Sequence, residues 1–314
     1  MTNTDGVYVN GDCIDTGDCS GPKSAKSVLL HPDVDAAVLE TARGGILREG
    51  LAFDKCDVAV VTNVGSGDHL GLNYITTVDE LAVLKRVIVQ NVAPKGTAVL
   101  NATDPVVAAK GAVKHYVNLA DIPVTLGGSI GFQVENVMAS VAAVWALGLD
   151  WETVRAGLAS FSSENDNAQG RFNIFNYKGA TVIADYGHNP DAMAALVQAV
   201  QAMPASRRSV VISGPGDRRD EDIRQITQIL GDAFDEVVMY EDQCQRGRSD
   251  GEVMALLREG LAGAKKTTQR SEIYGEFLAI DTALAHLQAG ELCLVLVDQV
   301  PQAMAHIAAR VESL

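Results

Sequence analysis

The sequence predicts an α/β protein of two domains, built on largely parallel sheets. Three observations support this class: the length of 314 residues, the apolar content of 47%, and short β-branched apolar runs that alternate with longer segments of helical period. A chain of this length commonly divides into two cores. Strands that alternate with helices usually pair in parallel, because each helix returns the chain to the starting edge of the sheet.

The predicted strands are short runs of apolar residues, which is typical of strands buried on both faces. They are 36–39, 58–62, 98–100, 181–184, 209–212, 236–239 and 292–297. The predicted helices carry an apolar face with helical spacing. They are 77–91, 133–147, 151–160, 191–202, 220–234, 272–289 and 300–312. A hairpin with its turn at 177–179 opens the second half of the chain.

The domain boundary is expected in the polar stretch 162–170, which has no hydrophobic periodicity and follows two predicted helices. Segments between domains are typically polar and lack a buried face. We therefore predict one domain over residues 1–165 and a second over residues 166–314.

Charge and cysteine content limit the expected partners and compartment. The chain has 25 Lys and Arg against 40 Asp and Glu, a formal charge of −15, so nucleic acid and membrane surfaces are not expected as partners. Its cysteines are odd in number and contain no C-x-x-C pair, which favours reduced thiols over a zinc site. They are Cys13, Cys19, Cys56, Cys244 and Cys293. With no apolar run of roughly 18 residues and no signal region, the chain is expected to be cytoplasmic.

The first candidate motif is Glu40-Thr41-Ala42-Arg43-Gly44-Gly45, directly after a predicted strand. Ligands of open α/β sheets gather at the carboxyl ends of strands, so Glu40 could bind a divalent cation while the glycines admit a phosphate. The alternative is a solvated acid at a strand end, followed by a turn.

The second motif is Thr62-Asn63-Val64-Gly65-Ser66-Gly67-Asp68-His69-Leu70, again after a predicted strand. A single histidine is more often structural than a ligand. Its position beside Asp68 on a loop favours a site, and oxygen ligands with one imidazole suit Mg²⁺ or Mn²⁺.

Further candidates lie near the middle of the chain. The amide of Asn136, at a helix start, could both donate to and accept from an adenine edge, or could simply be a polar helix-start residue. Arg171, beside Gly170, could clamp a phosphate, and Asp185, at a strand end, could accept from ribose hydroxyls. The segment around Asn189 is also a good helix start, and both interpretations can hold.

Two later loops also follow predicted strands. The stretch 214–220 resembles an anion-binding loop only loosely, because glycine-rich turns are common before helices. The stretch 240–248 contains Arg246 and Arg248, which suggest carboxylate recognition in an acidic chain, although an ordinary surface loop is the alternative.

In this order the motifs resemble the Mur ligase superfamily, and within it most closely the C-terminal half of the cyanophycin synthetases. The matching segments are 39–51, 62–69, 170–173 and 216–223. The resemblance implies a central ATPase-type parallel sheet followed by a Rossmann-like C-terminal domain. It also implies an ATP-dependent amide ligase that forms an acyl phosphate and then lets an amine displace the phosphate.

The resemblance implies roles for individual residues. Glu40 and His69 would hold Mg²⁺, while Asp68 and Asn63 would shape their loop. Lys85 matches a lysine that several members carry as a carbamate, although from the residues alone it is an exposed helix charge. The resemblance also implies that Asn136 binds adenine, Arg171 a phosphate and Asp185 the ribose. The residues it implies for substrate binding are Arg43, His188, Arg246 and Arg248.

The implied substrates are ATP, arginine and a polyaspartate-like acceptor, and the chain could form a homo-oligomer. The chain contains no G-K-[ST] sequence, so we expect its central sheet to lack the family's P-loop strand and its activity alone to be low. The stretch from Asp104 to Gly131 also looks shorter than in the family. Two alternatives remain: a non-catalytic binding or oligomerisation module, and another Mur-type ligase such as a folylpolyglutamate-like enzyme.

Overall fold

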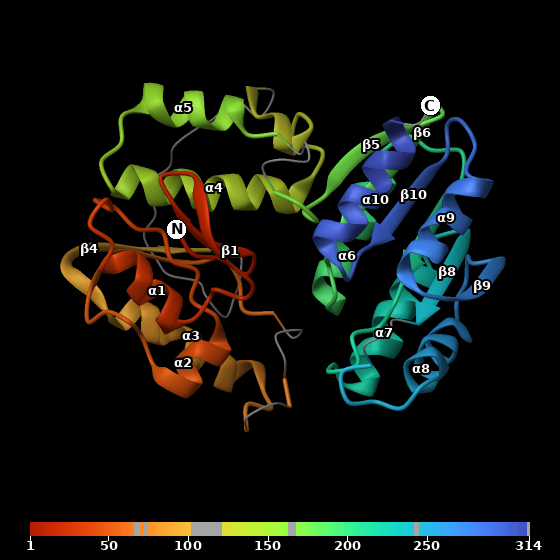
Figure 1. Ribbon diagram of the computed structural model, residues 1–314, viewed down its shortest axis with the longest axis horizontal. Coiled ribbons are helices and arrows are strands. Elements are labelled where there is room, and N and C mark those ends of the chain that lie inside the picture. The colour runs from red at the N-terminus through yellow and green to blue at the C-terminus, as the bar shows by residue number, and fades with distance from the viewer. Residues whose placement is uncertain (66–69, 72–73, 102–120, 163–167, 242–244, 313–314) are drawn as a thin grey trace. The chain divides into compact units, whose positions relative to one another are not determined.

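The computed structural model describes residues 1–65, 70–71, 74–101, 121–162, 168–241 and 245–312, which form two compact units (Figure 1). The first unit takes the described residues of 1–64, 75–111 and 139–149. The second takes those of 65–74, 112–138 and 150–314. The boundary predicted at residue 165 lies outside the described residues and stays a prediction.

The second unit is built on a six-stranded sheet in the order β5-β6-β10-β7-β8-β9. Its strands are β5 (Asn173–Tyr177), β6 (Ala180–Asp185), β7 (Arg208–Ile212), β8 (Glu236–Glu241), β9 (Gln269–Tyr274) and β10 (Leu292–Leu296). Strand β5 pairs antiparallel with β6, and all the other pairs in this sheet are parallel. The predicted parallel α/β fold is therefore confirmed for this unit.

Helices cover both faces of this sheet (Figure 1). They are α6 (Pro190–Ala202), α7 (Asp220–Gly231), α8 (Glu252–Leu261), α9 (Glu276–His286) and α10 (Val300–Glu312). Alternate strand residues point to opposite faces. Leu294 joins the cluster beneath α6, α7 and α8, whereas Val295 joins the cluster beneath α9 and α10. Both residues are fully buried, so the unit is a three-layer α/β/α fold with two apolar layers.

The hairpin predicted at 177–179 joins β5 to β6. Tyr177 pairs with Ala180 across a two-residue turn in which Lys178 and Gly179 have φ angles of 51° and 79°. Such a turn matches the twist of the strands and needs positive φ at both positions. The predicted start of α6 is also confirmed, because the Asn189 side chain caps the helix by accepting from the Ala192 N–H.

The first unit contains two small sheets. Strands β1 (Gly6–Val9) and β2 (Asp12–Thr16) form an antiparallel hairpin, and β3 (Cys56–Val61) pairs in parallel with β4 (Val92–Leu100). Helix α3 (Val78–Gln90) connects β3 to β4 and begins at a capping box formed by Thr77 and Glu80. The other helices that the structure describes before β5 are α1 (Pro22–Leu29), α2 (Arg43–Glu49), η2 (Pro123–Thr125), α4 (Gly131–Ala146) and α5 (Trp151–Ser160).

Two predicted elements are wrong in part. Within 36–39 only Leu39 makes a sheet contact, a parallel bridge to Thr2, because just one edge of the segment has a strand-like neighbour. The helix predicted over 272–289 begins at Glu276, since residues 272–274 belong to β9 and Gly275 changes the chain direction with φ of 92°. None of the described helices is long and apolar enough to cross a membrane.

Truncation of Leu294 tests whether β10 is the buried centre of the second unit. Leu294 is fully buried and lies between β6 and β7, so Leu294→Ala should lower the free energy of unfolding by about 2–5 kcal/mol. Urea titration followed by circular dichroism measures the change. Leu278→Ala, on the exposed side of α9, is the matched control and should cost less than about 1 kcal/mol. Equal losses in both variants would contradict this packing.

Candidate functional site

A cavity of about 760 Å³ lies beside β3 in the first unit. The segment from Asp35 to Thr41 lines it together with β3, Asn63 on the chain beyond β3, and Lys85 on α3. In the described part of the chain, β3 pairs with β4 alone, so the opposite edge of β3 faces this cavity. Three of the predicted site residues, Glu40, Asn63 and Lys85, thus line one space.

Glu40 is held in place by Thr4. Its Oε2 accepts from the Thr4 backbone N–H and its Oε1 accepts from the Thr4 hydroxyl, both at 3.0 Å. Each carboxylate oxygen has lone pairs left for another ligand. Oxygen ligands of this kind suit Mg²⁺, which commonly takes one or two carboxylates with water and phosphate.

The other predicted residues of the metal site cannot be placed beside Glu40 from the described residues. Asp68 and His69 lie outside the described residues. Among the described residues, no three His, Cys, Asp or Glu side chains are grouped so as to hold a metal ion. Within the described residues the carboxylate of Glu40 is one oxygen donor that suits Mg²⁺, and the role of His69 stays a prediction.

Arg43 and Asn136 lie outside the lining of both cavities that we describe. Arg43 is half-buried and is the first residue of α2. Asn136 lies in α4, where its Nδ2 donates to Gln133 Oε1 at 3.2 Å. The substrate contact of Arg43 and the adenine contact of Asn136 stay predictions.

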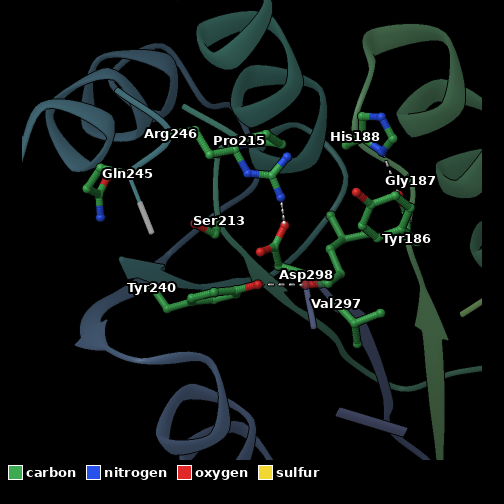
Figure 2. Close-up of a pocket in the computed structure, with 12 residues that line it drawn as sticks. Tyr186, Gly187, His188, Ser213, Pro215, Tyr240, Gln245, Arg246, Val297 and Asp298 are labelled. Atoms are coloured by element: carbon green, nitrogen blue, oxygen red, sulfur yellow. Dashed lines mark hydrogen bonds and ion pairs between the residues drawn. The ribbon is translucent and has the colours of Figure 1, made fainter. Parts of the chain in front are cut away.

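The second cavity lies at the carboxyl ends of β6, β7, β8 and β10 (Figure 2). Twelve residues line it. They are Tyr186, Gly187, His188, Ser213, Gly214, Pro215, Tyr240, Gln245, Arg246, Leu296, Val297 and Asp298. Two predicted substrate residues, His188 and Arg246, are among them. Parallel sheets commonly bind ligands at this edge, so this cavity is the candidate ligand site of the second unit.

Arg246 extends across this cavity to Asp298 (Figure 2). Its Nη2 lies 2.6 Å from Asp298 Oδ1, and its Nη1 lies 3.5 Å from Asp217 Oδ1. Burial lowers the pKa of the Arg246 guanidinium, but nearby Asp298, Tyr186 and Asp217 raise it by more, so the net shift is upward. The backbone of Arg246 has a φ of 49°, a conformation that bulky residues adopt only where the surrounding structure holds them.

Tyr186, which lines the second cavity, contacts the side chains of Arg171 and His188. The Arg171 guanidinium lies 5.7 Å from the centre of the Tyr186 ring, a cation–π contact. The His188 ring lies 4.8 Å from the same ring, and His188 Nδ1 lies 2.8 Å from the Tyr186 carbonyl oxygen. Arg171 is exposed, so its guanidinium can contact an anion while it lies over the tyrosine.

Asp185, at the end of β6, holds the backbone on both sides of this cluster. Its Oδ2 accepts from the Phe172 N–H at 2.9 Å, and its Oδ1 accepts from the Gly187 N–H at 2.6 Å. Burial raises the pKa of Asp185 to about 6, although both backbone hydrogen bonds and Arg171 act to lower it. Both oxygens thus have partners inside the protein, and the ribose contact predicted for Asp185 stays a prediction.

Arg248 does not line the second cavity. Its guanidinium donates to the carbonyl oxygens of Gly216 and Arg218 at 2.8 and 2.7 Å, and pairs with Glu252 at 2.7 Å. These contacts fasten two loops together. The loops approach so closely that a Cβ at Gly216 would collide with the carbonyl oxygen of Gln245. The structure therefore gives Arg248 a role in loop packing, and its substrate contact stays a prediction.

Comparison with known protein families finds a matching domain in each half of the chain. Residues 1–120 match the Mur ligase middle domain, and residues 170–297 match the Mur ligase glutamate ligase domain. The chain belongs to the Mur ligase family. The predicted resemblance is thereby confirmed.

Relatives of this chain include cyanophycin synthetases. That of Synechocystis sp. is 38% identical over 98% of this chain, and the chain spans 40% of the length of that relative. Among solved structures, MurF from Acinetobacter baumannii matches with a TM-score of 0.61 at 20% identity, covering 90% of this chain and 66% of that one. FolC from E. coli in complex with ADP matches with a TM-score of 0.56 at 21% identity, covering 82% and 63%. At these identities the two structures confirm the fold of this chain and no more.

Among the residues that line the second cavity but are missing from the predicted site are Tyr186, Tyr240 and Asp298. Each lies at or just after the carboxyl end of a strand, the same position that identified Asp185 and Arg246. Tyr240 donates to the Leu296 carbonyl oxygen at 3.3 Å, so it also links two strand ends. A consistent search of all strand ends would have identified these residues from the sequence.

Titration of Asp185 should make part of the stability of the second unit depend on pH. Its pKa of about 6 in the folded chain exceeds the ordinary value of 3.8, so the folded chain binds this proton more tightly than the unfolded chain does. The contribution of Asp185 is then greatest below pH 4 and falls as the pH rises through 6. The free energy of unfolding of the wild type minus that of Asp185→Asn should fall by about 3 kcal/mol between pH 4 and 7.

The matched control is Asp281→Asn in α9. The hydrogen bonds from Arg310 hold the pKa of Asp281 below its ordinary value. Asp281 therefore contributes to the free energy of unfolding at a pH above its ordinary pKa, and this contribution is lost as the pH falls. This pH dependence is opposite in sign to that of Asp185. Urea titrations across the pH range measure both differences. If the free energy of unfolding of the wild type minus that of Asp185→Asn rose with pH, the raised pKa of the buried Asp185 would be contradicted.

Proposed function

We propose that this chain forms part of an ATP-dependent amide ligase that joins arginine to the side-chain carboxylate of a polyaspartate acceptor. The observation that carries the proposal is the 38% identity with a cyanophycin synthetase over 98% of the chain. The chain spans 40% of the length of that relative. The proposal is therefore limited to the steps of the reaction in which these two domains take part.

Such a ligase phosphorylates the acceptor carboxylate with ATP, and the amine of the amino acid then displaces phosphate through a tetrahedral intermediate. Bound Mg²⁺ would neutralise charge on the phosphates. In this chain Glu40 would hold the ion, because its carboxylate is fixed by Thr4 and lines the cavity of the first unit. Asn63 and Lys85 line the same cavity and would orient the groups around it.

For the nucleotide, we assign a phosphate contact to Arg171, adenine to Asn136 and ribose to Asp185. The exposed guanidinium of Arg171, held over Tyr186, supports the phosphate contact. Asp185 also positions Arg171, because it accepts from the N–H of Phe172, the next residue.

For the amino acid, we assign the second cavity, with Arg246 as the partner of the α-carboxylate and His188 beside it. Arg246 carries a permanent positive charge in a planar fork that suits carboxylates. Arg43 and Arg248 remain candidates for acceptor contacts. We place the reaction in the cytoplasm; the described cysteines Cys13, Cys19, Cys56 and Cys293 are free thiols, which suits a reducing compartment.

The direct test measures phosphate release from ATP with Mg²⁺, an oligoaspartate acceptor and arginine. We expect release to depend on both the acceptor and arginine. The ratio of the rates with and without arginine is decisive, because the chain contains no G-K-[ST] sequence and its absolute rate should be low. Release that depends on glutamate and a folate would favour a folylpolyglutamate-like ligase. Binding of oligoaspartate without any release would favour a non-catalytic module.

Removal of the Glu40 charge tests the proposed metal contact. Glu40→Gln keeps one oxygen for Thr4 but loses the anionic ligand, so arginine-dependent phosphate release should fall about 100-fold and require more Mg²⁺. Glu49→Gln, an exposed acid in α2, is the matched control and should keep the wild-type rate. An unchanged Mg²⁺ requirement in Glu40→Gln would show that Glu40 does not hold the ion.

A further inference from the structure

The second cavity presents two opposite charges to a ligand. Of its lining residues, Arg246 is a permanent cation and Asp298 is a carboxylate, and the two lie 2.6 Å apart. Their side chains are 31% and 20% exposed, so solvent and small solutes can reach both. A site of this kind can bind a molecule that carries an anion and a cation at its two ends.

Asp298 is held more firmly than a residue on an open loop would be. The side chain of Glu276, which is only 2% exposed, accepts from the backbone N–H groups of Asp298 and Gln299 at 2.8 and 3.1 Å. On the other side, Tyr240 donates to the carbonyl oxygen of Leu296, two residues before Asp298. These contacts fix the backbone of Asp298 while its carboxylate faces the cavity, and a fixed carboxylate selects its partner better than a mobile one.

Arg246 has a second acidic partner besides Asp298. Asp217 Oδ1 lies 3.5 Å from Arg246 Nη1, whereas Asp298 contacts the other terminal nitrogen, Nη2. If a ligand occupies Asp298, Arg246 can keep its contact with Asp217 and turn its other nitrogen to a ligand carboxylate. The cavity has a volume of only about 20 Å³, room for one water molecule, because Arg246 reaches across it. An amino acid therefore has to displace Arg246 from Asp298.

We infer that Asp298 is the residue that selects the side chain of the incoming amino acid, and that a guanidinium or ammonium group of the substrate takes the place that Arg246 holds in the structure. The inference rests on the proposed function, since it concerns the amino-acid site of that ligase. The exchange breaks one ion pair and forms two, Asp298 with the substrate cation and Arg246 with the substrate carboxylate. A neutral side chain of the same shape offers Asp298 no positive charge in exchange for Arg246, which disfavours its binding.

The test compares L-arginine with L-citrulline, whose side chain has nearly the same shape but no charge. Calorimetric titration of the whole chain should show arginine binding at least about tenfold more tightly than citrulline. In Asp298→Asn the two affinities should become about equal, through weaker arginine binding. In Asp298→Glu, which keeps the charge on a longer side chain, arginine should still bind more tightly than citrulline. Asp281→Asn is the matched control, because it also breaks an arginine–aspartate pair but lies outside the cavity, and it should keep the wild-type preference.

A preference for arginine that survives in Asp298→Asn would overturn the inference, as would a wild-type chain that binds neither amino acid. Thermal melting of each variant shows whether it is folded. If Asp298→Asn is not folded, the affinities of Asp298→Glu for arginine and citrulline are compared with those of the wild type instead. Failure of the proposed function gives a different result. Arginine would then bind with a preference that depends on Asp298 while phosphate release shows no dependence on arginine.

Discussion

Burial of the parallel sheet on both faces is the constraint on which the second unit depends. Strand residues such as Leu294 and Val295 alternate between two apolar layers, so neither face of the sheet can accept a charged group without a large desolvation cost. In the central strands β6, β10, β7 and β8, charged side chains are then confined to the strand ends and the loops beyond them. Arg246 and Asp298 both lie beyond one end of the sheet, which is why residues far apart in the sequence line a single cavity, and Asp185 at the same end holds the backbone of Gly187 beside it.

Carboxylates that accept backbone N–H groups recur at the sites described here. Glu40 accepts from Thr4, Asp185 from Phe172 and Gly187, and Glu276 from Asp298 and Gln299. In each case an acidic side chain fixes a loop next to a candidate ligand position. Loops carry the chemistry of α/β proteins but lack the ladder of hydrogen bonds that orders strands, so such clamps supply the missing rigidity.

Local signals were sufficient wherever neighbouring residues decide the backbone. The turn at Lys178 and Gly179 and the cap at Asn189 were predicted from a few adjacent residues and are present. Asn10-Gly11, the turn between β1 and β2, is an equally strong hairpin signal in the sequence, and its φ angles of 52° and 94° fit such a turn, but this hairpin is absent from the predicted elements. The strand expected over 36–39 failed for another reason: an apolar run becomes a strand only when neighbouring backbone pairs with it, and the sequence does not show those neighbours.

The sequence by itself determined the α/β class, most of the strands and helices, and the family, because these depend on periodicity and on motifs of adjacent residues. It also identified Arg246 as a binding candidate. Only the tertiary structure decided that Arg246 faces Asp298 across a cavity, that Arg248 instead fastens two loops, and that the oxygens of Asp185 are occupied by backbone N–H groups. The physical reason is that a charged side chain takes its role from partners that folding brings to it, and those partners lie up to 52 residues away along the chain.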